Sequence, residues 1–150
     1  MENTISLYVA PYIADWLVHH FGEPVRFPNG SPENVMLRYY TSKRAPEQVE
    51  HPRHTRPVRI ILPDHPYKRA QYYCHLSDKN RGKFCRMLSE LFKAQLWTDN
   101  VRLLTSRTEI KDGLICWCRK NGVGTQHLDT VTKIFYRARM RYQRAGLAEM

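Results

Sequence analysis

A stretch near the C-terminus, Thr125 to Arg144, carries the pattern that most constrains the fold of this chain. At helical spacing it places an apolar side chain at every third or fourth position. These positions are Leu128, Val131, Phe135, Ala138 and Tyr142. Such a stripe is stable only when it is buried against other elements. The stretch therefore predicts a long amphipathic helix with one buried side.

The far side of the same predicted helix is basic. Its cations recur at the same spacing, at Lys133, Arg137, Arg141 and Arg144. No acidic residue lies between Asp129 and Glu149 to neutralise them. A cationic row opposite a buried stripe fits a helix laid on nucleic-acid phosphates. The alternative is a solvated surface helix of a basic protein.

The net charge supports a polyanionic partner. The 150 residues carry a formal charge of +10, with a pI near 9.7. Residues 1–50 hold 4 basic and 6 acidic side chains, whereas residues 51–100 and 101–150 each hold 10 basic and 4 acidic ones. The excess thus belongs to the later two thirds of the chain. An acidic protein or an anionic membrane surface would also be attracted to this positive charge.

The cysteines and the hydropathy pattern predict a cytoplasmic protein with no membrane segment. The four cysteines are Cys74, Cys85, Cys116 and Cys118, and they form no CxxC pair. Cys116 and Cys118 would point roughly 200° apart on a helix, so they cannot share a metal or bridge each other. Free thiols in a reducing compartment are the favoured interpretation. The first residues show no cationic region followed by a long apolar run, and the sequence has no apolar run of 18 residues, so no leader or membrane segment is expected.

Two short strands are predicted in the N-terminal half. Residues 4–9 (TISLYV) alternate apolar and polar side chains, and residues 58–62 (VRIIL) are β-branched. Prolines on both sides of the second strand predict a small sheet or an edge position. Between them, residues 42–57 hold three prolines and no periodicity, which predicts a loop.

Two helices are predicted in the same half. Pro11 opens the first, which ends against Gly22, and Ser31 caps a second that runs to about Thr41. Apolar and aromatic side chains of the second helix are interpreted as core rather than as a base-stacking platform, because the nearby charge is mixed. They are Val35, Met36, Tyr39 and Tyr40.

From Leu76 onward the chain is predicted to be helical. Ser77 caps a helix to about Trp97. Its inward side chains are predicted to be Phe84, Leu88, Leu91, Phe92 and Leu96. Its other side holds a second basic row, Lys79, Lys83 and Arg86. Ser106 to Glu109 has capping-box spacing for the next helix. That helix stops at Asn121-Gly122, and Thr125 caps the last one.

Together these elements predict one α+β domain over residues 1–150. It is predominantly helical, with a few short strands in the N-terminal half. Residues 1–63 form its mixed strand and helix part, and residues 64–150 form its basic helical part. The chain contains no internal repeat and no low-complexity tract.

The last two predicted helices have the outline of a helix-turn-helix. A helix over about 107–121, the turn NGVG and a basic helix over 125–145 follow one another. In that motif the first residues of the second helix reach base edges, here Gln126, His127 and Thr130. The alternative is a helical hairpin packed antiparallel to the 77–97 helix.

A metal-dependent nuclease is a remote alternative. Pro63-Asp64 and Glu109-Ile110-Lys111 resemble the spelling of the PD-(D/E)xK nucleases, in which acidic side chains hold Mg²⁺. In those enzymes the E-x-K segment is a strand, whereas here it falls in a predicted first helical turn. The histidines between His51 and His75 lack zinc-finger spacing and are interpreted as loop residues. No catalytic residue, metal ligand or cofactor is assigned.

Two segments resemble a known group of proteins. They are YVAPYIADWLVHHFGEPVRFPNGSPENVML near the start, and CWCRKNG followed by VTKIFYRARMRY near the end. Both are similar to small basic proteins of Mu-like prophages and related bacterial mobile elements. The resemblance implies an element-encoded accessory or regulator that acts near DNA, and it supplies no active-site residues.

The sequence therefore predicts a non-catalytic protein that binds double-stranded DNA. The row on the last helix would contact phosphates, helped by Lys79, Lys83 and Arg86 if the two rows share a surface. The second hypothesis is an assembly module, or a homodimer, whose basic face meets an acidic partner.

Overall fold

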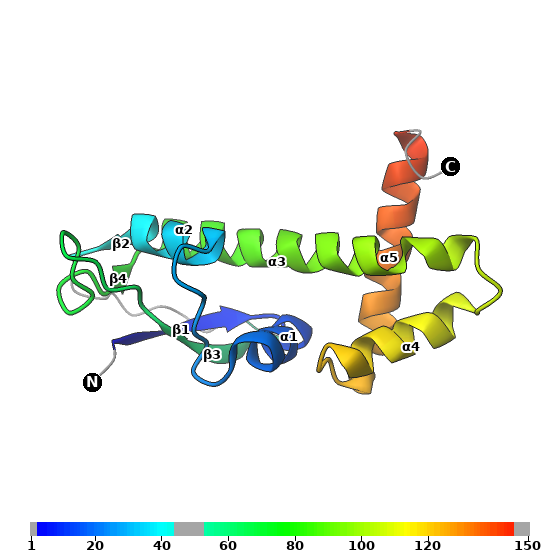
Figure 1. Ribbon diagram of the computed structural model, residues 1–150, viewed down its shortest axis with the longest axis horizontal. Coiled ribbons are helices and arrows are strands. Elements are labelled where there is room, and N and C mark those ends of the chain that lie inside the picture. Colours follow the sequence, from blue (N-terminus) through cyan, green and yellow to red (C-terminus); the bar gives the residue numbers. More distant parts are fainter. Residues whose placement is uncertain (1–2, 44–52, 146–150) are drawn as a thin grey trace. The chain divides into compact units, whose positions relative to one another are not determined.

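The chain forms a mainly helical α+β structure, as the sequence predicts (Figure 1). The computed structural model describes residues 3–43 and 53–145. It divides into two compact units, Met1–Leu88 and Ser89–Met150. The long helix α3 (Asp78–Asn100) contributes residues to both units.

A small antiparallel sheet organises the first unit. Strand β1 (Thr4–Val9) pairs with β3 (Arg56–Ile61), with Leu7 opposite Val58. Alternate side chains of β1 are buried, so one face of the sheet belongs to the core. Val25 adds a bridge on the other edge of β3, where its N–H donates to Arg59 and its carbonyl accepts from Ile61, both at 2.8 Å. Both predicted strands and the small sheet are thus confirmed.

The helices of this unit begin and end where their local chemistry predicts. Helix α1 (Pro11–Phe21) starts at its proline and stops at Gly22, whose φ of 88° favours glycine. Helix α2 (Pro32–Tyr40) is capped by the Ser31 hydroxyl, which accepts from the Asn34 N–H at 3.2 Å. The Ser77 hydroxyl accepts from Asn80 in the same way at the start of α3.

Two further short strands tie the end of α2 to the segment before α3. Strand β2 (Thr41–Ser42) pairs antiparallel with β4 (His75–Leu76). His75 is buried in β4, so its interpretation as a loop residue is wrong. Within the predicted loop over 42–57, Ser42 belongs to β2, and Arg56 and Pro57 belong to β3. Residues 44–52 of this loop lie outside the described residues.

The core interpretation of α2 is wrong for two of its side chains. Leu37 is its only buried residue, while Tyr39 is 75% exposed and Val35 is 42% exposed. Helical spacing identifies which residues share a face, but contacts with other elements decide which face is buried. Here the buried face is narrow and passes through Leu37.

The described part of the second unit is built from helices joined by short connections. After α3 it contains the 3-10 turn η1 (Val101–Leu104), helix α4 (Ile110–Lys120), the 3-10 turn η2 (Thr125–His127) and helix α5 (Leu128–Arg144). Its core is formed by apolar side chains of α3, α4 and α5. They are Phe92, Leu96, Leu114, Trp117, Val131, Ile134, Phe135 and Ala138. Leu91, predicted to face inward, is 36% exposed.

Two predicted caps in this unit are wrong. Helix α4 begins only after Glu109, and no side chain caps it. The Ser106 hydroxyl instead donates to the carbonyls of Leu103 and Thr108, both at 3.4 Å, so it stabilises the connection between η1 and α4. Thr125 opens η2 rather than capping α5, and no side chain caps α5 either.

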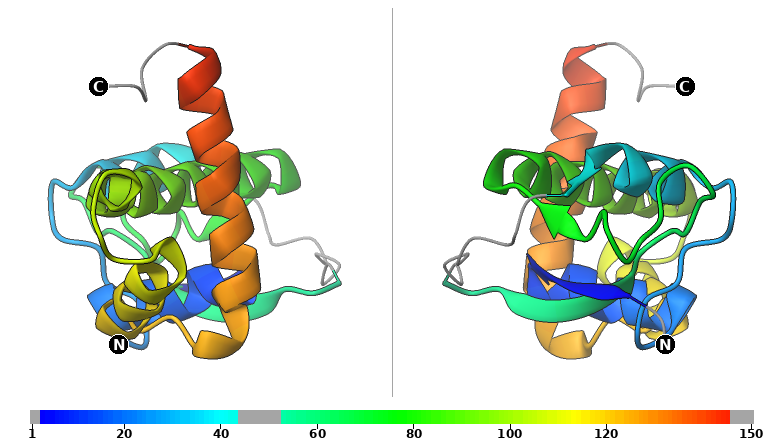
Figure 2. Two further views of the ribbon diagram at one scale, coloured as in Figure 1. Left: turned by 90° about the vertical axis from the view of Figure 1, so that its right-hand side faces the viewer. Right: turned by 90° about the vertical axis from the view of Figure 1, so that its left-hand side faces the viewer.

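Helix α5 crosses the C-terminal part of α3 steeply (Figures 1 and 2). The alternative of a hairpin packed antiparallel to α3 is therefore wrong. Helices α4 and α5 do form consecutive inclined helices, joined by residues 121–127. Gly122 has a φ of 72° in this connection, and Val123 is buried.

Candidate nucleic-acid interface

The basic row of α5 is exposed along its whole length. Lys133, Arg137, Arg141 and Arg144 all belong to the exposed class. The apolar stripe on the same helix is buried at Val131, Phe135 and Ala138, with Ile134 added. The two-sided character that the sequence predicts for this helix is thus present in the structure.

The row lies beside the buried stripe rather than directly opposite it. Arg137 and Arg141 line a small cavity of about 110 Å³ together with Ile134 and Ala138 of their own helix. The other wall comes from α3. It consists of Glu90, Lys93, Ala94 and Trp97. Lys93 is thus a cation of this surface that the sequence analysis missed, because nothing in the local pattern pairs α3 with α5.

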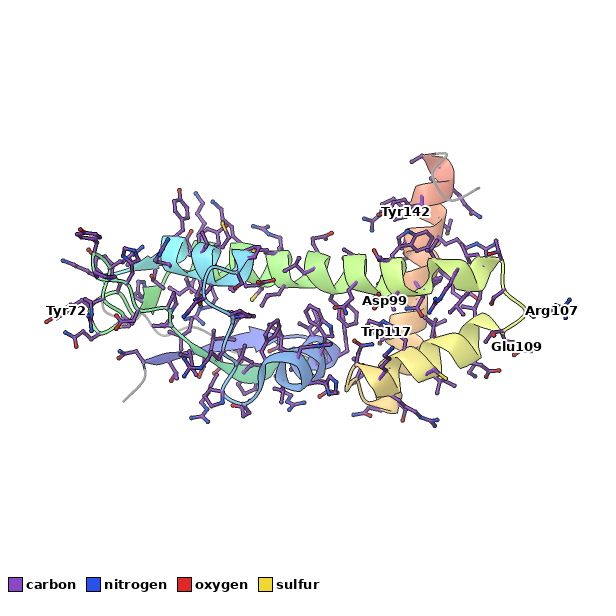
Figure 3. The ribbon with its side chains drawn as sticks, viewed as in Figure 1. Tyr72, Asp99, Arg107, Glu109, Trp117 and Tyr142 are labelled. Atoms are coloured by element: carbon purple, nitrogen blue, oxygen red, sulfur yellow. The ribbon has the colours of Figure 1, made fainter. Side chains whose placement is uncertain are left out.

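An aromatic stack holds this part of α5 against α3. The rings of Trp97 and Tyr142 are stacked, with centroids 4.8 Å apart and planes 8° from parallel. Trp97 also contacts Phe135 of α5, and the centroids of these two rings lie 5.4 Å apart. Tyr142 is seen on α5 close to α3 in Figure 3. Arg137 and Arg141 follow Phe135 and precede Tyr142 along α5, so these aromatic contacts with Trp97 hold the helical segment that carries both arginines.

The cations of this surface have few anionic neighbours. Glu90 is the only acid at the cavity, and its carboxylate lies 3.6 Å from the Lys93 ammonium. Both groups are partly solvated, so this ion pair contributes little stability. Within the described residues, Arg137 and Arg141 form no ion pair with a carboxylate. Their charge is therefore available to an external anion.

The end of α5 that follows η2 has a different character. Gln126 and His127 lie in η2 itself, and Thr130 lies exposed in the first turn of α5 beside Asp129. The Gln126 amide folds back over Gly124, since a Cβ placed there would lie only 2.2 Å from Gln126 Oε1. Base contacts from these three residues stay a prediction.

The second predicted row belongs to the first unit. Lys79, Lys83 and Arg86 are exposed on the N-terminal half of α3. They follow one another at three- and four-residue spacing, as predicted, and so form a row of their own. Whether they bind nucleic acid stays a prediction.

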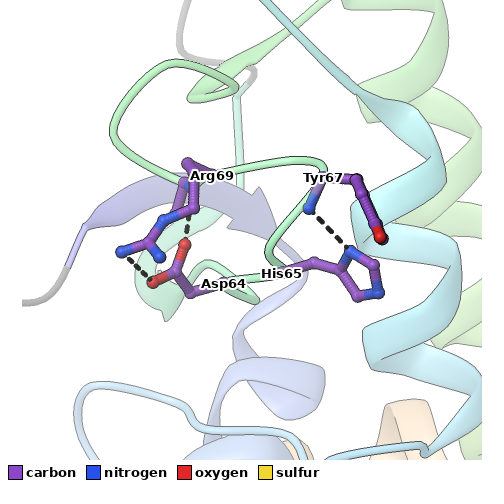
Figure 4. A network of polar contacts seen from close by, with 5 residues as sticks. Asp64, His65, Tyr67 and Arg69 are labelled. Carbon is purple, nitrogen blue, oxygen red and sulfur yellow. Dashed lines mark hydrogen bonds and ion pairs between the residues drawn. The ribbon is translucent and has the colours of Figure 1, made fainter.

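The groups named for the nuclease alternative are used structurally. In the first unit, Asp64 Oδ1 accepts from the Ala70 N–H at 3.0 Å, and Asp64 Oδ2 lies 3.1 Å from the Arg69 guanidinium (Figure 4). In the second unit, Glu109 and Lys111 flank the start of α4, not a strand. His51 lies outside the described residues. Within residues 3–43 and 53–145, no group of three or more His, Cys, Asp or Glu side chains could hold a metal ion.

A second surface with binding character was missed by the sequence analysis. The loop that follows Pro63 exposes Tyr67 and Tyr72 and carries Lys68 and Arg69. The spelling PYKRAQYY, in which aromatic and basic residues alternate closely, was the available signal.

Comparison of the chain with protein-family models, curated proteins and solved structures finds no match. The functional argument therefore depends on the surfaces themselves. Among the described helices, none has the length and apolar character needed to cross a membrane.

Proposed function

We propose that this chain binds double-stranded DNA without catalysing a reaction on it, and that α5 lies along the phosphate backbone. The supporting observation is the exposed basic row, Lys133 to Arg144, whose two central arginines have no described carboxylate partner. Lys93 of α3 extends the same surface across the cavity. Phosphates attract such cations and release condensed counterions when they bind.

The length of the row limits how many phosphates it can reach. From Lys133 to Arg144 a helix rises about 16 Å, which is roughly half of one turn of duplex DNA. With Lys93, five cations are available, so the expected slope of log affinity against log salt is about −3 to −4.5. Binding through this surface is backbone contact, which positions a protein on DNA without reading its sequence.

The biological setting of the proposal comes from the resemblance to mobile-element proteins. An accessory or regulatory protein of a prophage would act on DNA in the cytoplasm. Contact with phosphates alone would give it affinity for any duplex. Base contacts from Gln126, His127 and Thr130 would be the additional source of sequence preference.

The test is fluorescence anisotropy of the protein with a labelled random-sequence duplex, titrated across about 50 to 300 mM salt. We expect a linear fall of log affinity with the slope given above. The double variant Arg137→Glu, Arg141→Glu, which reverses both charges, should weaken duplex binding more than tenfold at low salt and reduce the magnitude of the salt slope by about 2. Both side chains are exposed, so the melting temperature should change little.

A matched control separates the row from the net charge. Arg102 and Arg107 are exposed in the same unit but lie outside α5. The double variant Arg102→Glu, Arg107→Glu makes the same change in net charge. Equal losses of affinity in the two double variants would refute a defined phosphate-contacting row.

The competing hypothesis is a basic face that meets an acidic protein. It predicts no duplex binding even at low salt, together with a defined oligomer or protein complex. Added Mg²⁺ should leave the duplex intact under the proposal, whereas cutting that disappears on Asp64→Ala would establish the nuclease instead.

A further inference from the structure

The first unit exposes aromatic rings to an unusual degree at one end. Tyr67, Tyr39 and Tyr72 are 91%, 75% and 60% exposed. Tyrosine rings carry large apolar area that is normally covered in a folded protein, so several bare rings in one region indicate an interaction surface. We call Tyr39, Tyr67, Tyr72 and Tyr73, with Lys43 and Lys68, the tyrosine cluster.

Contacts between the loop and α2 join these residues into one surface. The Lys68 ammonium donates to the carbonyl of Arg38, the residue before Tyr39. The pairing of β2 with β4 places Ser42 opposite His75, which brings Lys43 to the same loop. The Nζ atoms of Lys43 and Lys68 each lie 5.2 Å from the centroid of the Tyr73 ring. Two cations thus lie over one aromatic ring, a cation–π arrangement.

The loop that carries Tyr67 is held by its own polar contacts. Its Asp64 carboxylate binds the Ala70 N–H and the Arg69 guanidinium, and His65 Nδ1 accepts from the Tyr67 N–H at 3.2 Å (Figure 4). The Lys68 N–H donates to the His65 carbonyl at 2.9 Å and closes a turn. The Tyr67 ring therefore projects from an ordered backbone, so the loop has little conformational freedom to lose on binding.

We infer that the tyrosine cluster binds unpaired bases of single-stranded nucleic acid, with ring faces stacking on bases and the two lysines beside the phosphates. Every base has a π-face, so stacking on tyrosine tolerates any sequence. The ammonium groups beside the rings match the negative backbone that accompanies each base. This site does not depend on the duplex contact proposed for α5.

The composition of the surface favours nucleic acid over a protein partner. Among the described residues of this unit, the exposed large hydrophobic side chains are the three tyrosines and Val35. Protein interfaces add aliphatic and Met side chains around their aromatic anchors. Flat rings interleaved with lysines are instead the arrangement found in single-strand binding proteins.

The test is anisotropy of the full chain with a labelled oligothymidylate of about 20 nucleotides, which offers bases and phosphates but no duplex. The double variant Tyr67→Ala, Tyr72→Ala should bind at least about tenfold more weakly than the wild type. The matched variant Tyr67→Phe, Tyr72→Phe keeps both ring faces and should bind within about twofold of the wild type. Tyr67 and Tyr72 are both exposed, so both variants should fold, and thermal melting followed by circular dichroism checks this.

Two arms keep this inference separate from the duplex proposal. The Tyr67→Ala, Tyr72→Ala variant should bind duplex DNA with unchanged affinity. When Arg137→Glu and Arg141→Glu are added, the alanine variant should still bind the single strand more weakly than the phenylalanine variant, by the same factor. The inference is overturned if the alanine pair binds the oligothymidylate as the wild type does. It is also overturned if the phenylalanine pair loses as much affinity as the alanine pair, or if the wild type binds no single strand at low salt.

Discussion

Two glycines in helices predict opposite responses to the same substitution. Gly113 lies in α4, where a Cβ would come within 2.5 and 2.6 Å of the two Leu103 methyl carbons and 3.1 Å of Leu103 Cγ. Gly82 lies in α3, and a Cβ there would meet nothing within 4 Å. In a helix without contacts, alanine is more stable than glycine by about 1 kcal/mol.

The magnitudes follow from these distances. Gly82→Ala should raise the free energy of unfolding by about 0.5–1 kcal/mol. At Gly113 the same gain is opposed by overpacking, which costs about 1–3 kcal/mol. A rotation about the last bond of Leu103 moves its methyl carbons but leaves Cγ 3.1 Å from the new Cβ, so the Leu103 side chain must also shift as a whole. We therefore expect Gly113→Ala to lower the free energy of unfolding by about 1 kcal/mol.

The assay is urea unfolding of each single variant, followed by circular dichroism, with the midpoint and the slope compared with the wild type. A double-mutant cycle with Leu103→Ala isolates the clash. The Gly113→Ala penalty should disappear in the Leu103→Ala background, since the methyl groups that it meets are gone. A stabilising Gly113→Ala, equal to Gly82→Ala, would refute the described packing of η1 on α4.

Two other side chains of α4 give further predictions. The Trp117 indole N–H donates to Asp99 Oδ2 at 2.9 Å, and the two side chains approach each other in Figure 3. Asp99→Ala should therefore lower the free energy of unfolding by about 1 kcal/mol, and Asp99→Asn should lower it less, because the amide oxygen still accepts the hydrogen bond. Equal losses of stability in urea unfolding would contradict this bond. Burial raises the pKa of the Cys118 thiol from 9.0 to about 11, so at pH 8.5 peptide-resolved mass spectrometry should find exposed Cys116 alkylated well before Cys118. The stability linked to this thiol is present below pH 9 and is lost as the pH rises through about 11. Cys118→Ala should therefore lose less stability than the wild type over this pH range. An unchanged pH profile of stability would contradict the raised pKa.

Local chemistry explains which boundaries the sequence analysis predicted correctly. Ser31 and Ser77 each accept a hydrogen bond from the N–H three residues ahead, which is a property of a short segment. Gly22 and Gly122 end helices with a positive φ, which is again local. Ser106 has the same signature as the other caps, but its hydroxyl donates to the carbonyls of Leu103 and Thr108 in the connection before α4.

Burial was predicted less well than helical periodicity. Tyr39 and Leu37 lie on the same short helix, and the sequence analysis assigned Tyr39 to the core without naming Leu37. Only the packing of α2 in its unit buries Leu37 and leaves Tyr39 in solvent. The sequence analysis set a base-stacking role for α2 aside because the nearby charge is mixed, but the exposed Tyr39 ring is accessible for stacking.

The sequence by itself determined the amphipathic character of α5 and its basic row, because charge and helical spacing are properties of consecutive residues. Only the tertiary structure placed Lys93 beside Arg137 and Arg141, and only it joined Tyr39 to the loop of Tyr67 through the bond from Lys68 to Arg38. These groups are separated by 28 to 48 positions along the chain, and side-chain periodicity carries no information over such separations. Contacts at that range form where buried faces pack together, which is a property of the whole fold.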